Sequence, residues 1–219
     1  MDQVKCIKSD GNIFGIALNY KCLYDSLQTR FNEKPYINEP IKPVLFIKTP
    51  NTRNVDQGVV IKPKNETLQA GPSLGVVIGK STSRVSEDQA KAHIAGYVVV
   101  NELSLPEESY YRPAIKAKCR DGFCVIGHVI AKDQVKNVDR LQLRVLVNGE
   151  LKQQGTTANW IRSPERLIAE ISDYMTLNEG DIILTGTPLG RVDLQNGDVV
   201  SIEIDQLGKV TNHIQEQDA

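Results

Sequence analysis

The stretch Leu141-Gln142-Leu143-Arg144-Val145-Leu146-Val147-Asn148-Gly149 carries the clearest structural signal in this chain. Apolar residues at 141, 143, 145 and 147 recur with a period of two, which is typical of a strand with one buried face. Asn148-Gly149 then supplies the two positive backbone angles that a two-residue turn requires. The stretch therefore predicts a β-hairpin.

Downstream of the hairpin, the sequence predicts one helix and two further strands. Ser163-Pro164-Glu165 places a cap, a proline and an acid at a helix start, and apolar residues at 167, 168, 171 and 175 form one stripe that we expect to pack on a sheet. Residues 178–181 and 195–198 are tight turns, each followed by a strand-like apolar run. Beyond Ile214 the polar tail is expected to fray.

Upstream of the hairpin, extended segments again predominate. Residues 74–78 form a strand-like run, and Ser86 with Gln89 three positions later has the spacing of a helix capping box. Gly96 ends that helix, and residues 97–100 return to extended structure. This last strand brings Asn101 and Glu102 to its end.

The first fifty residues predict a small N-terminal lobe, and residues 51–219 predict the main domain. The lobe would contain a strand at 13–18, a helix from about Tyr20 to Phe31, where Cys22, Leu23 and Leu27 have near-helical spacing, and a strand at 44–47. Pro50 ends the second strand.

Composition narrows the class of protein. The formal charge is −1 and lysines and arginines are interspersed with acids, so no basic footprint for nucleic acid is present. No apolar run approaches the roughly 20 residues that span a bilayer, and residues 1–5 lack the apolar core of a signal peptide. We therefore expect a cytoplasmic protein with no membrane or nucleic-acid partner.

The cysteines and histidines give no metal signature. Cys6, Cys22, Cys119 and Cys124 show no paired spacing and are interpreted as reduced, buried thiols. The three histidines are too far apart in sequence to form a ligand pair of the kind that binds zinc on a helix.

Two runs of sequence could carry chemistry. Residues 112–123 place four cations around Asp121, which could bind carboxylates of a substrate while Asp121 orients a lysine or arginine. A solvated charged loop is the commoner outcome for such residues. Residues 184–190, Leu-Thr-Gly-Thr-Pro-Leu-Gly, could bind an anion through backbone N–H groups, or form a plain turn.

Taken together in order, six segments resemble the fumarylacetoacetate hydrolase family. They are Gly75-Val76-Val77-Ile78-Gly79-Lys80, Ile94-Ala95-Gly96-Tyr97, Lys118-Cys119-Arg120-Asp121-Gly122-Phe123, Val147-Asn148-Gly149-Glu150, Thr176-Leu177-Asn178-Glu179-Gly180-Asp181 and Thr185-Gly186-Thr187-Pro188-Leu189-Gly190. The resemblance covers roughly residues 13–214. Residues 101–113 are most similar to the N-terminal repeat of a two-repeat isomerase/decarboxylase within that family.

The resemblance implies a mostly β, α+β fold: a rolled mixed β-sheet with a few short helices, paired as in a dimer. It implies a subunit of an isomerase/decarboxylase acting on 2-oxo-hexenedioate or 2-hydroxyhepta-2,4-diene-1,7-dioate type products of aromatic ring cleavage, in 4-hydroxyphenylacetate catabolism. The resemblance also gives Lys118 and Asp121 catalytic roles, with Asp121 orienting Lys118. Arg120, Gly186 and Thr187 would bind the small dicarboxylate oxo-acid.

The family resemblance also implies Mg²⁺, held by a Glu-X-Glu pair and a later acid. The later acid corresponds to Glu102, where the family commonly has Asp, but the pair corresponds to Gly71-Pro72-Ser73, which offers no carboxylate. An early family histidine corresponds to Leu23. One carboxylate among neutral neighbours predicts a weak, incomplete Mg²⁺ site.

Three readings follow from these departures. The chain could be an enzyme subunit working as a homodimer or beside a second, metal-binding family member. It could be a structural partner that turns over nothing. It could also be a stand-alone hydrolase or decarboxylase of another small oxo-acid, with Glu66, Glu107 or Glu108 as substitute ligands beside Glu102.

Overall fold

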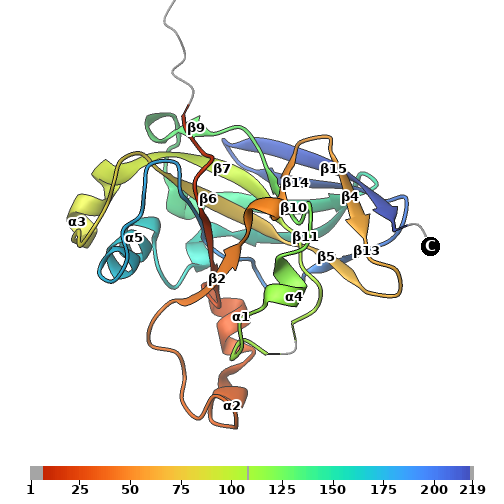
Figure 1. Ribbon diagram of the computed structural model, residues 1–219, viewed down its shortest axis with the longest axis horizontal. Helices are drawn as coiled ribbons and strands as arrows, with labels where there is room; N and C mark the ends of the chain where they lie inside the picture. Colours follow the sequence, from red (N-terminus) through yellow and green to blue (C-terminus); the bar gives the residue numbers. More distant parts are fainter. Residues whose placement is uncertain (1–6, 108, 218–219) are drawn as a thin grey trace, which may run out of the picture.

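The computed structural model describes residues 7–107 and 109–217 (Figure 1). Predictions that concern residues 1–5, Cys6 or Glu108 therefore lie outside the described residues. No helix in the described part of the chain has the length and apolar character needed to cross a membrane.

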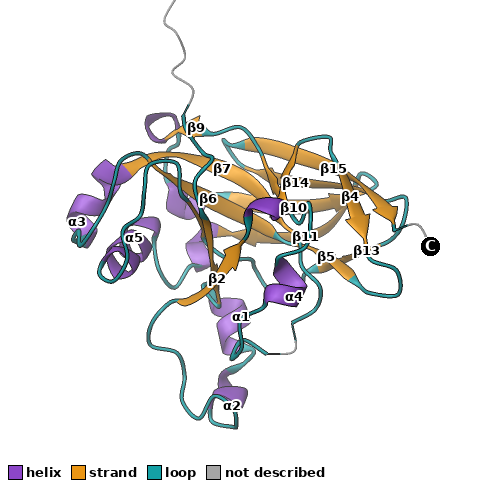
Figure 2. Cartoon of the chain, in the orientation of Figure 1, coloured by secondary structure: helices purple, strands orange, loops and turns teal. Residues whose placement is uncertain are grey.

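Three β-sheets form the body of the protein (Figure 2). An eight-stranded sheet has the order β2-β1-β12-β6-β7-β8-β3, with β9 paired to β7; a five-stranded sheet has the order β11-β10-β14-β15-β4; and β13 pairs with β5. The strands are β1 (Ile13–Ala17), β2 (Val44–Lys48), β3 (Arg53–Val55), β4 (Val59–Lys62), β5 (Leu68–Ala70), β6 (Pro72–Ile78), β7 (Ile94–Glu102), β8 (Cys124–Ile126), β9 (Ile130–Ala131), β10 (Gln142–Val147), β11 (Glu150–Thr156), β12 (Ile182–Leu184), β13 (Val192–Leu194), β14 (Val199–Ile204) and β15 (Gly208–Glu216).

The two larger sheets pack on each other and enclose the main core. Strand β6 contacts β10 and β14, while β7 contacts β14 and β15. Every residue of β6 is buried, and buried residues of both sheets form one apolar cluster that includes Val76, Val99, Val145 and Ile202. The predicted mostly β fold with mixed sheets and short helices is confirmed.

The helices are short and lie at the margins of the sheets. They are α1 (Lys21–Asp25), α2 (Gln28–Phe31), α3 (Glu87–Ala90), α4 (Ile115–Lys118) and α5 (Pro164–Ser172), with single 3₁₀ turns at Pro50–Thr52, Lys91–His93, Lys132–Gln134, Val138–Arg140 and Thr157–Asn159. Helices α3 and α5 lie side by side at one end, while α1 and α2 project from the sheets near β2 (Figure 1).

Several local predictions are confirmed by backbone geometry. Asn148 and Gly149 both have positive φ, 53° and 83°, and join β10 to β11. The Ser86–Gln89 capping box is formed at the start of α3. The Ser163 hydroxyl caps α5 by accepting a hydrogen bond from Arg166 N at 3.1 Å.

The single helix predicted for residues 20–31 is wrong, because the structure has two helical turns there. The Ser26 hydroxyl donates a hydrogen bond to the Leu23 carbonyl at 2.7 Å, and Leu27 has φ −111° and ψ 0°, far from the values of a regular α-helix. Side-chain bonds of this kind compete with the helical backbone. Phe31 is the buried residue of these two turns, so little packing holds them in one helix.

The expected fraying beyond Ile214 is also wrong for the next two residues. Strand β15 continues to Glu216, because Gln215 and Glu216 pair in parallel with Ile61 and Lys62 of β4. This pairing partner is about 150 residues away in sequence, and the polar composition of the tail gave no sign of it.

The cysteine prediction is correct for Cys124, which is fully buried. It is wrong for Cys22, which is exposed, and for Cys119, which is partly exposed. The domain boundary near residue 50 stays a prediction. In the structure β1 pairs with β12 and β2 pairs with β1, so both strands of the first fifty residues belong to the eight-stranded sheet.

Asn19 ties the end of β1 to two distant loops. Its side-chain amide donates hydrogen bonds to the carbonyls of Thr185 at 2.9 Å and Arg162 at 3.1 Å, and its oxygen accepts one from Arg162 N at 3.0 Å. The side chain is 1% exposed. Asn19 therefore fixes the position of the loop that begins at Thr185.

Replacing this residue should weaken the fold. Asn19→Ala leaves buried carbonyl and N–H groups without partners, so we expect the free energy of unfolding to fall by about 3 kcal/mol. Urea denaturation measures the loss. Asn159→Ala, at an exposed position, should change stability by less than about 0.5 kcal/mol. Equal losses for the two variants would contradict the clamping role.

Candidate active site

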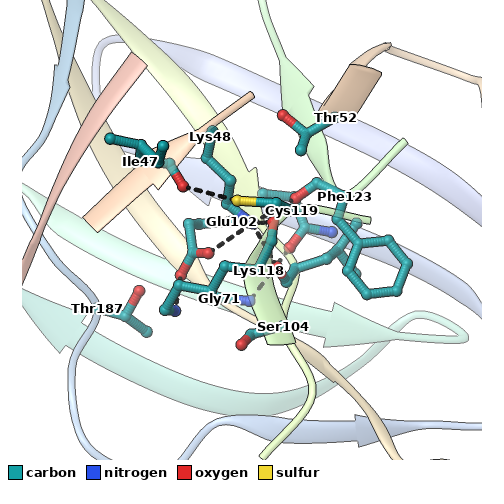
Figure 3. Close-up of polar contacts among 12 residues, drawn as sticks. Ile47, Lys48, Thr52, Gly71, Glu102, Ser104, Lys118, Cys119, Phe123 and Thr187 are labelled. Atoms are coloured by element: carbon teal, nitrogen blue, oxygen red, sulfur yellow. Dashed lines mark hydrogen bonds and ion pairs between the residues drawn. The ribbon is translucent and has the colours of Figure 1, made fainter. Parts of the chain in front are cut away.

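Glu102 is the centre of the candidate site. It is the last residue of β7, a strand that pairs with β6 on one side and β8 on the other, and it is 1% exposed. A buried carboxylate is tolerated only when cations and hydrogen-bond donors compensate it. Figure 3 shows the side chains of Lys48 and Lys118 converging on Glu102 from separate elements.

Lys48 reaches Glu102 from the end of β2. Its ammonium lies 2.7 Å from Glu102 Oε1 and donates hydrogen bonds to the carbonyls of Leu103, Lys118 and Phe123, at 2.6, 2.8 and 3.0 Å. The side chain is fully buried. Lys48 therefore links β2 to the segments that carry Glu102 and Lys118.

Lys118 lies at the end of α4, between two carboxylates. Its ammonium is 3.0 Å from Glu102 Oε2 and 2.9 Å from Glu107 Oε2, and it lies 4.4 Å from the centre of the Phe46 ring. Burial lowers the pKa of Lys118; Glu102 and Glu107 oppose this and Arg191 adds to it, so the pKa stays below its usual value.

Arg191 supplies the third cation. Its Nη1 donates a hydrogen bond to the Glu102 carbonyl at 2.8 Å, and its Nη2 pairs with the Glu102 carboxylate and contacts Thr187 Oγ1 at 3.4 Å. Burial alone would raise the pKa of Glu102, but Arg191, Lys118 and Lys48 hold it far below the usual range of a carboxyl. Glu102 is therefore ionised at neutral pH.

A cleft of about 280 Å³ opens beside this cluster. Glu102, Glu107, Lys118 and Arg191 line its charged side. Its other lining residues are Ile16, Ala17, Leu18, Leu23, Phe46, Gln69, Ser73, Pro106, Tyr110, Gly186, Thr187, Pro188, Leu189 and Gly190. The cleft combines a charged floor with apolar walls, as small-molecule sites commonly do.

The loop from Thr185 to Gly190 forms one wall of the cleft. Gly186 has φ +100°, a conformation that L side chains rarely adopt, and a Cβ there would lie 2.8 Å from the Ile16 carbonyl. The glycine thus allows the loop to pass close to β1. Gly186 and Thr187, both predicted to bind substrate, line the cleft.

The structure separates Asp121 and Arg120 from the other predicted site residues. Asp121 is exposed and accepts a hydrogen bond from Asn51 Nδ2 at 2.6 Å, so the predicted contact with Lys118 is corrected: Glu102 and Glu107 hold that lysine. Arg120 pairs with Glu66 at 2.7 Å and is absent from the cleft lining. The catalytic and binding roles given to these residues stay predictions.

The positions that the resemblance assigns to the metal do meet in space. Glu102 N donates a hydrogen bond to the Gly71 carbonyl at 2.7 Å, and Ser73 lines the cleft with Glu102. They offer one carboxylate, already paired with three cations. The described residues contain no group of three or more His, Cys, Asp or Glu side chains that could hold a metal ion. These residues do not fit Mg²⁺, which prefers several oxygen ligands.

The other carboxylates suggested as metal ligands are also paired with cations among the described residues. Glu107 contacts Lys118, and Glu66 contacts Arg120 and Lys116. Each carboxylate thus faces a cation. Glu108 lies outside the described residues.

Sequence reasoning missed Lys48 and Arg191. Lys48 follows the apolar run Val44–Ile47 and Arg191 follows the Thr185–Gly190 loop, and neither belongs to a segment that carries the family resemblance. A lysine at the end of the apolar run Val44–Ile47 was the available signal for Lys48.

The family is shown by direct comparison. The model of the fumarylacetoacetate (FAA) hydrolase C-terminal family matches residues 12–215. This chain belongs to that family. The 4-hydroxyphenylacetate degradation bifunctional isomerase/decarboxylase of Escherichia coli is 42% identical over 192 residues, which is 88% of this chain and 44% of that protein. The chain thus spans less than half the length of this relative.

Solved structures agree with the fold. The 5-carboxymethyl-2-hydroxymuconate delta-isomerase of Mycobacterium smegmatis has a TM-score of 0.82 and 27% identity, covering 97% of this chain and 81% of that one. The maleylpyruvate hydrolase of Sphingobium sp. SYK-6, in complex with manganese(II) and pyruvate, has a TM-score of 0.78 and 25% identity, covering 94% and 71%.

The depressed pKa of Glu102 predicts a pH dependence of stability. A carboxyl with a lowered folded pKa stabilises the fold above the pKa of a free Glu, about 4.5, and this contribution is lost as the pH falls below it. Glu102→Gln leaves three cations facing the single carboxylate of Glu107, so we expect the free energy of unfolding to fall by about 3–5 kcal/mol at pH 7.

The difference in the free energy of unfolding between wild type and Glu102→Gln should stay constant from pH 8 to about 5.5. Below that pH it should narrow by up to about 1.4 kcal/mol per pH unit. Urea denaturation at each pH measures it. Glu179→Gln, at an exposed position, serves as the control. A difference that does not narrow in acid would mean that Glu102 is not held ionised.

Proposed function

We propose that this chain is a subunit of a cytoplasmic isomerase/decarboxylase that acts on small dicarboxylate oxo-acids from aromatic ring cleavage. The observation that carries the proposal is the position of Lys118: its ammonium is buried at the floor of the cleft, between Glu102 and Glu107. The E. coli relative, a bifunctional isomerase/decarboxylase of 4-hydroxyphenylacetate degradation, supports the choice of substrate class.

Lys118 suits the chemistry of such acids. Double-bond migration or decarboxylation of an oxo-acid builds negative charge on an enolate oxygen, and a fixed cation stabilises that charge most as it forms. A lysine whose pKa is lowered by burial also gives up its proton more readily than a free lysine. One residue would thus stabilise the enolate and return the proton to carbon.

The charges of the site favour an anionic ligand. Lys48, Lys118 and Arg191 face the two carboxylates of Glu102 and Glu107, which leaves one net positive charge beside the cleft. An oxo-acid carboxylate would compensate it. Thr187 and the Gly186 backbone, which also line the cleft, would contact the oxygens of the substrate.

We further propose that the chain works as a homodimer or beside a second family member that carries the Glu-X-Glu pair and holds Mg²⁺. The 42%-identical relative is more than twice as long as the matched segment, which supports pairing of two such units. Gly71 and Ser73 favour a second candidate function, a structural partner that stabilises the metal-binding subunit without turnover.

Lys118→Met separates the two functions. If Lys118 transfers the proton, kcat/KM of the assembly for 2-hydroxyhepta-2,4-diene-1,7-dioate should fall by about 100-fold or more, while light scattering shows unchanged assembly. The decay of the dienol absorbance measures turnover. The assay uses the chain co-produced with the family member that carries Glu-X-Glu, and the chain alone.

Lys209→Met, at an exposed position on β15, is the matched control and should retain activity within about twofold. Lys118→Arg keeps the positive charge, but an arginine does not release its proton in proteins. This variant should therefore retain assembly and stability without restoring the rate. Full activity of folded Lys118→Met would assign the turnover to the partner and leave this chain a structural role.

A further inference from the structure

The guanidinium of Arg191 lies where the predicted metal positions meet. It bonds the carbonyl and the carboxylate of Glu102, and a side chain at position 71 would overlap it, with a Cβ 2.9 Å from Arg191 Cζ. Gly71 and Arg191 are therefore complementary, because the space that a residue-71 side chain would need is filled by the guanidinium.

Arg191 remains available to a ligand. Its side chain is 18% exposed and lines the cleft. A guanidinium has five N–H donors, and the contacts made by described residues are those to the Glu102 carbonyl, the Glu102 carboxylate and Thr187. The Nε–H and one Nη1–H have no partner among the described residues, and each can donate a charge-assisted hydrogen bond to a carboxylate oxygen.

Ser73 provides a second, independent observation that points to a ligand in the cleft. Its side chain is fully buried and lines the same cleft, yet its hydroxyl has no hydrogen-bond partner among the described residues. A buried unpaired hydroxyl costs free energy unless something satisfies it. An oxygen of a bound acid would do so.

We propose that Arg191 is the resident cation of this site, and that it binds the carboxylate of a 2-oxo acid directly, in place of a divalent metal. Lys118 would then face the 2-oxo group and Ser73 would donate to a carboxylate oxygen. This inference rests on the proposed oxo-acid function, and it adds that ligand binding by this chain needs no metal.

Calorimetry with 2-oxoadipate tests the binding. This saturated six-carbon 2-oxo diacid lacks the double bond of the proposed substrates, so binding is measured without isomerisation. Wild type in EDTA should bind it, and Arg191→Met should weaken binding by about 10- to 100-fold, the loss of a charge-assisted hydrogen bond. Affinity of Arg191→Lys should fall between the two, because lysine keeps the charge but not the fixed donor directions of the guanidinium.

Arg144→Met is the matched control, since Arg144 pairs with Asp205 on the five-stranded sheet and should leave 2-oxoadipate binding unchanged. Thermal melts identify variants that fail to fold, and the measurement on wild type in EDTA needs no variant. Wild type that binds 2-oxoadipate only after Mg²⁺ is added would overturn the inference, as would equal binding by folded Arg191→Met.

Manganese binding gives a second test of whether Arg191 takes the place of a divalent metal. Ser73→Glu adds a carboxylate beside Glu102, and the electron paramagnetic resonance signal of free Mn²⁺ reports its uptake. We expect uptake by the double variant Ser73→Glu/Arg191→Met and at least tenfold weaker uptake by Ser73→Glu alone, because Arg191 still holds Glu102. Equal uptake by the two, or tight uptake by wild type, would contradict the assignment.

These outcomes are independent of turnover. Binding of 2-oxoadipate through Arg191 with no activity on the diene substrate would refute the proposed function and leave the inference standing. If EDTA abolished both the activity and 2-oxoadipate binding, the inference about Arg191 would be refuted and the proposed function would stand.

Discussion

The carboxylate of Glu102, removed from water and surrounded by three cations, is the interaction on which the site depends. Its desolvation costs several kcal/mol and is offset only while Lys48, Lys118 and Arg191 stay in contact with it. Loss of any one of these partners removes part of the compensation of the buried Glu102 carboxylate. The cluster therefore fixes the relative positions of β2, β7, α4 and the loop before β13.

The fold serves this cluster by bringing strand ends together. Strand β7 lies in the middle of the eight-stranded sheet and ends at Glu102, while β2, at the edge of that sheet, ends at Lys48. The hydrogen bond from Asn19 to the Thr185 carbonyl fixes the start of the Thr185–Gly190 loop, which lines the cleft with Glu102. The cleft thus lies between the sheet and this loop, and residues distant in sequence share one small volume.

An arginine differs from a divalent ion in ways that matter for the chemistry of such a site. A guanidinium carries one charge, binds carboxylates in a plane and cannot be removed by chelators, whereas Mg²⁺ carries two charges and gathers six ligands. A site built on Arg191 is therefore suited to binding and orienting an acid. Because Arg191 carries a smaller charge than Mg²⁺, more of the stabilisation of an enolate must come from Lys118.

The sequence alone determined the mostly β fold, the hairpin at Asn148-Gly149, the caps at Ser86 and Ser163 and the family, because periodicity, caps and ordered motifs are local properties of the chain. It also placed Lys118, Glu102 and Thr187 in one site and showed that residues 71 and 73 lack carboxylates. It could not show that Arg191, 89 residues from Glu102, takes that space, or that Glu107 rather than Asp121 holds Lys118. Such pairs depend on long-range packing, which only the tertiary structure decides.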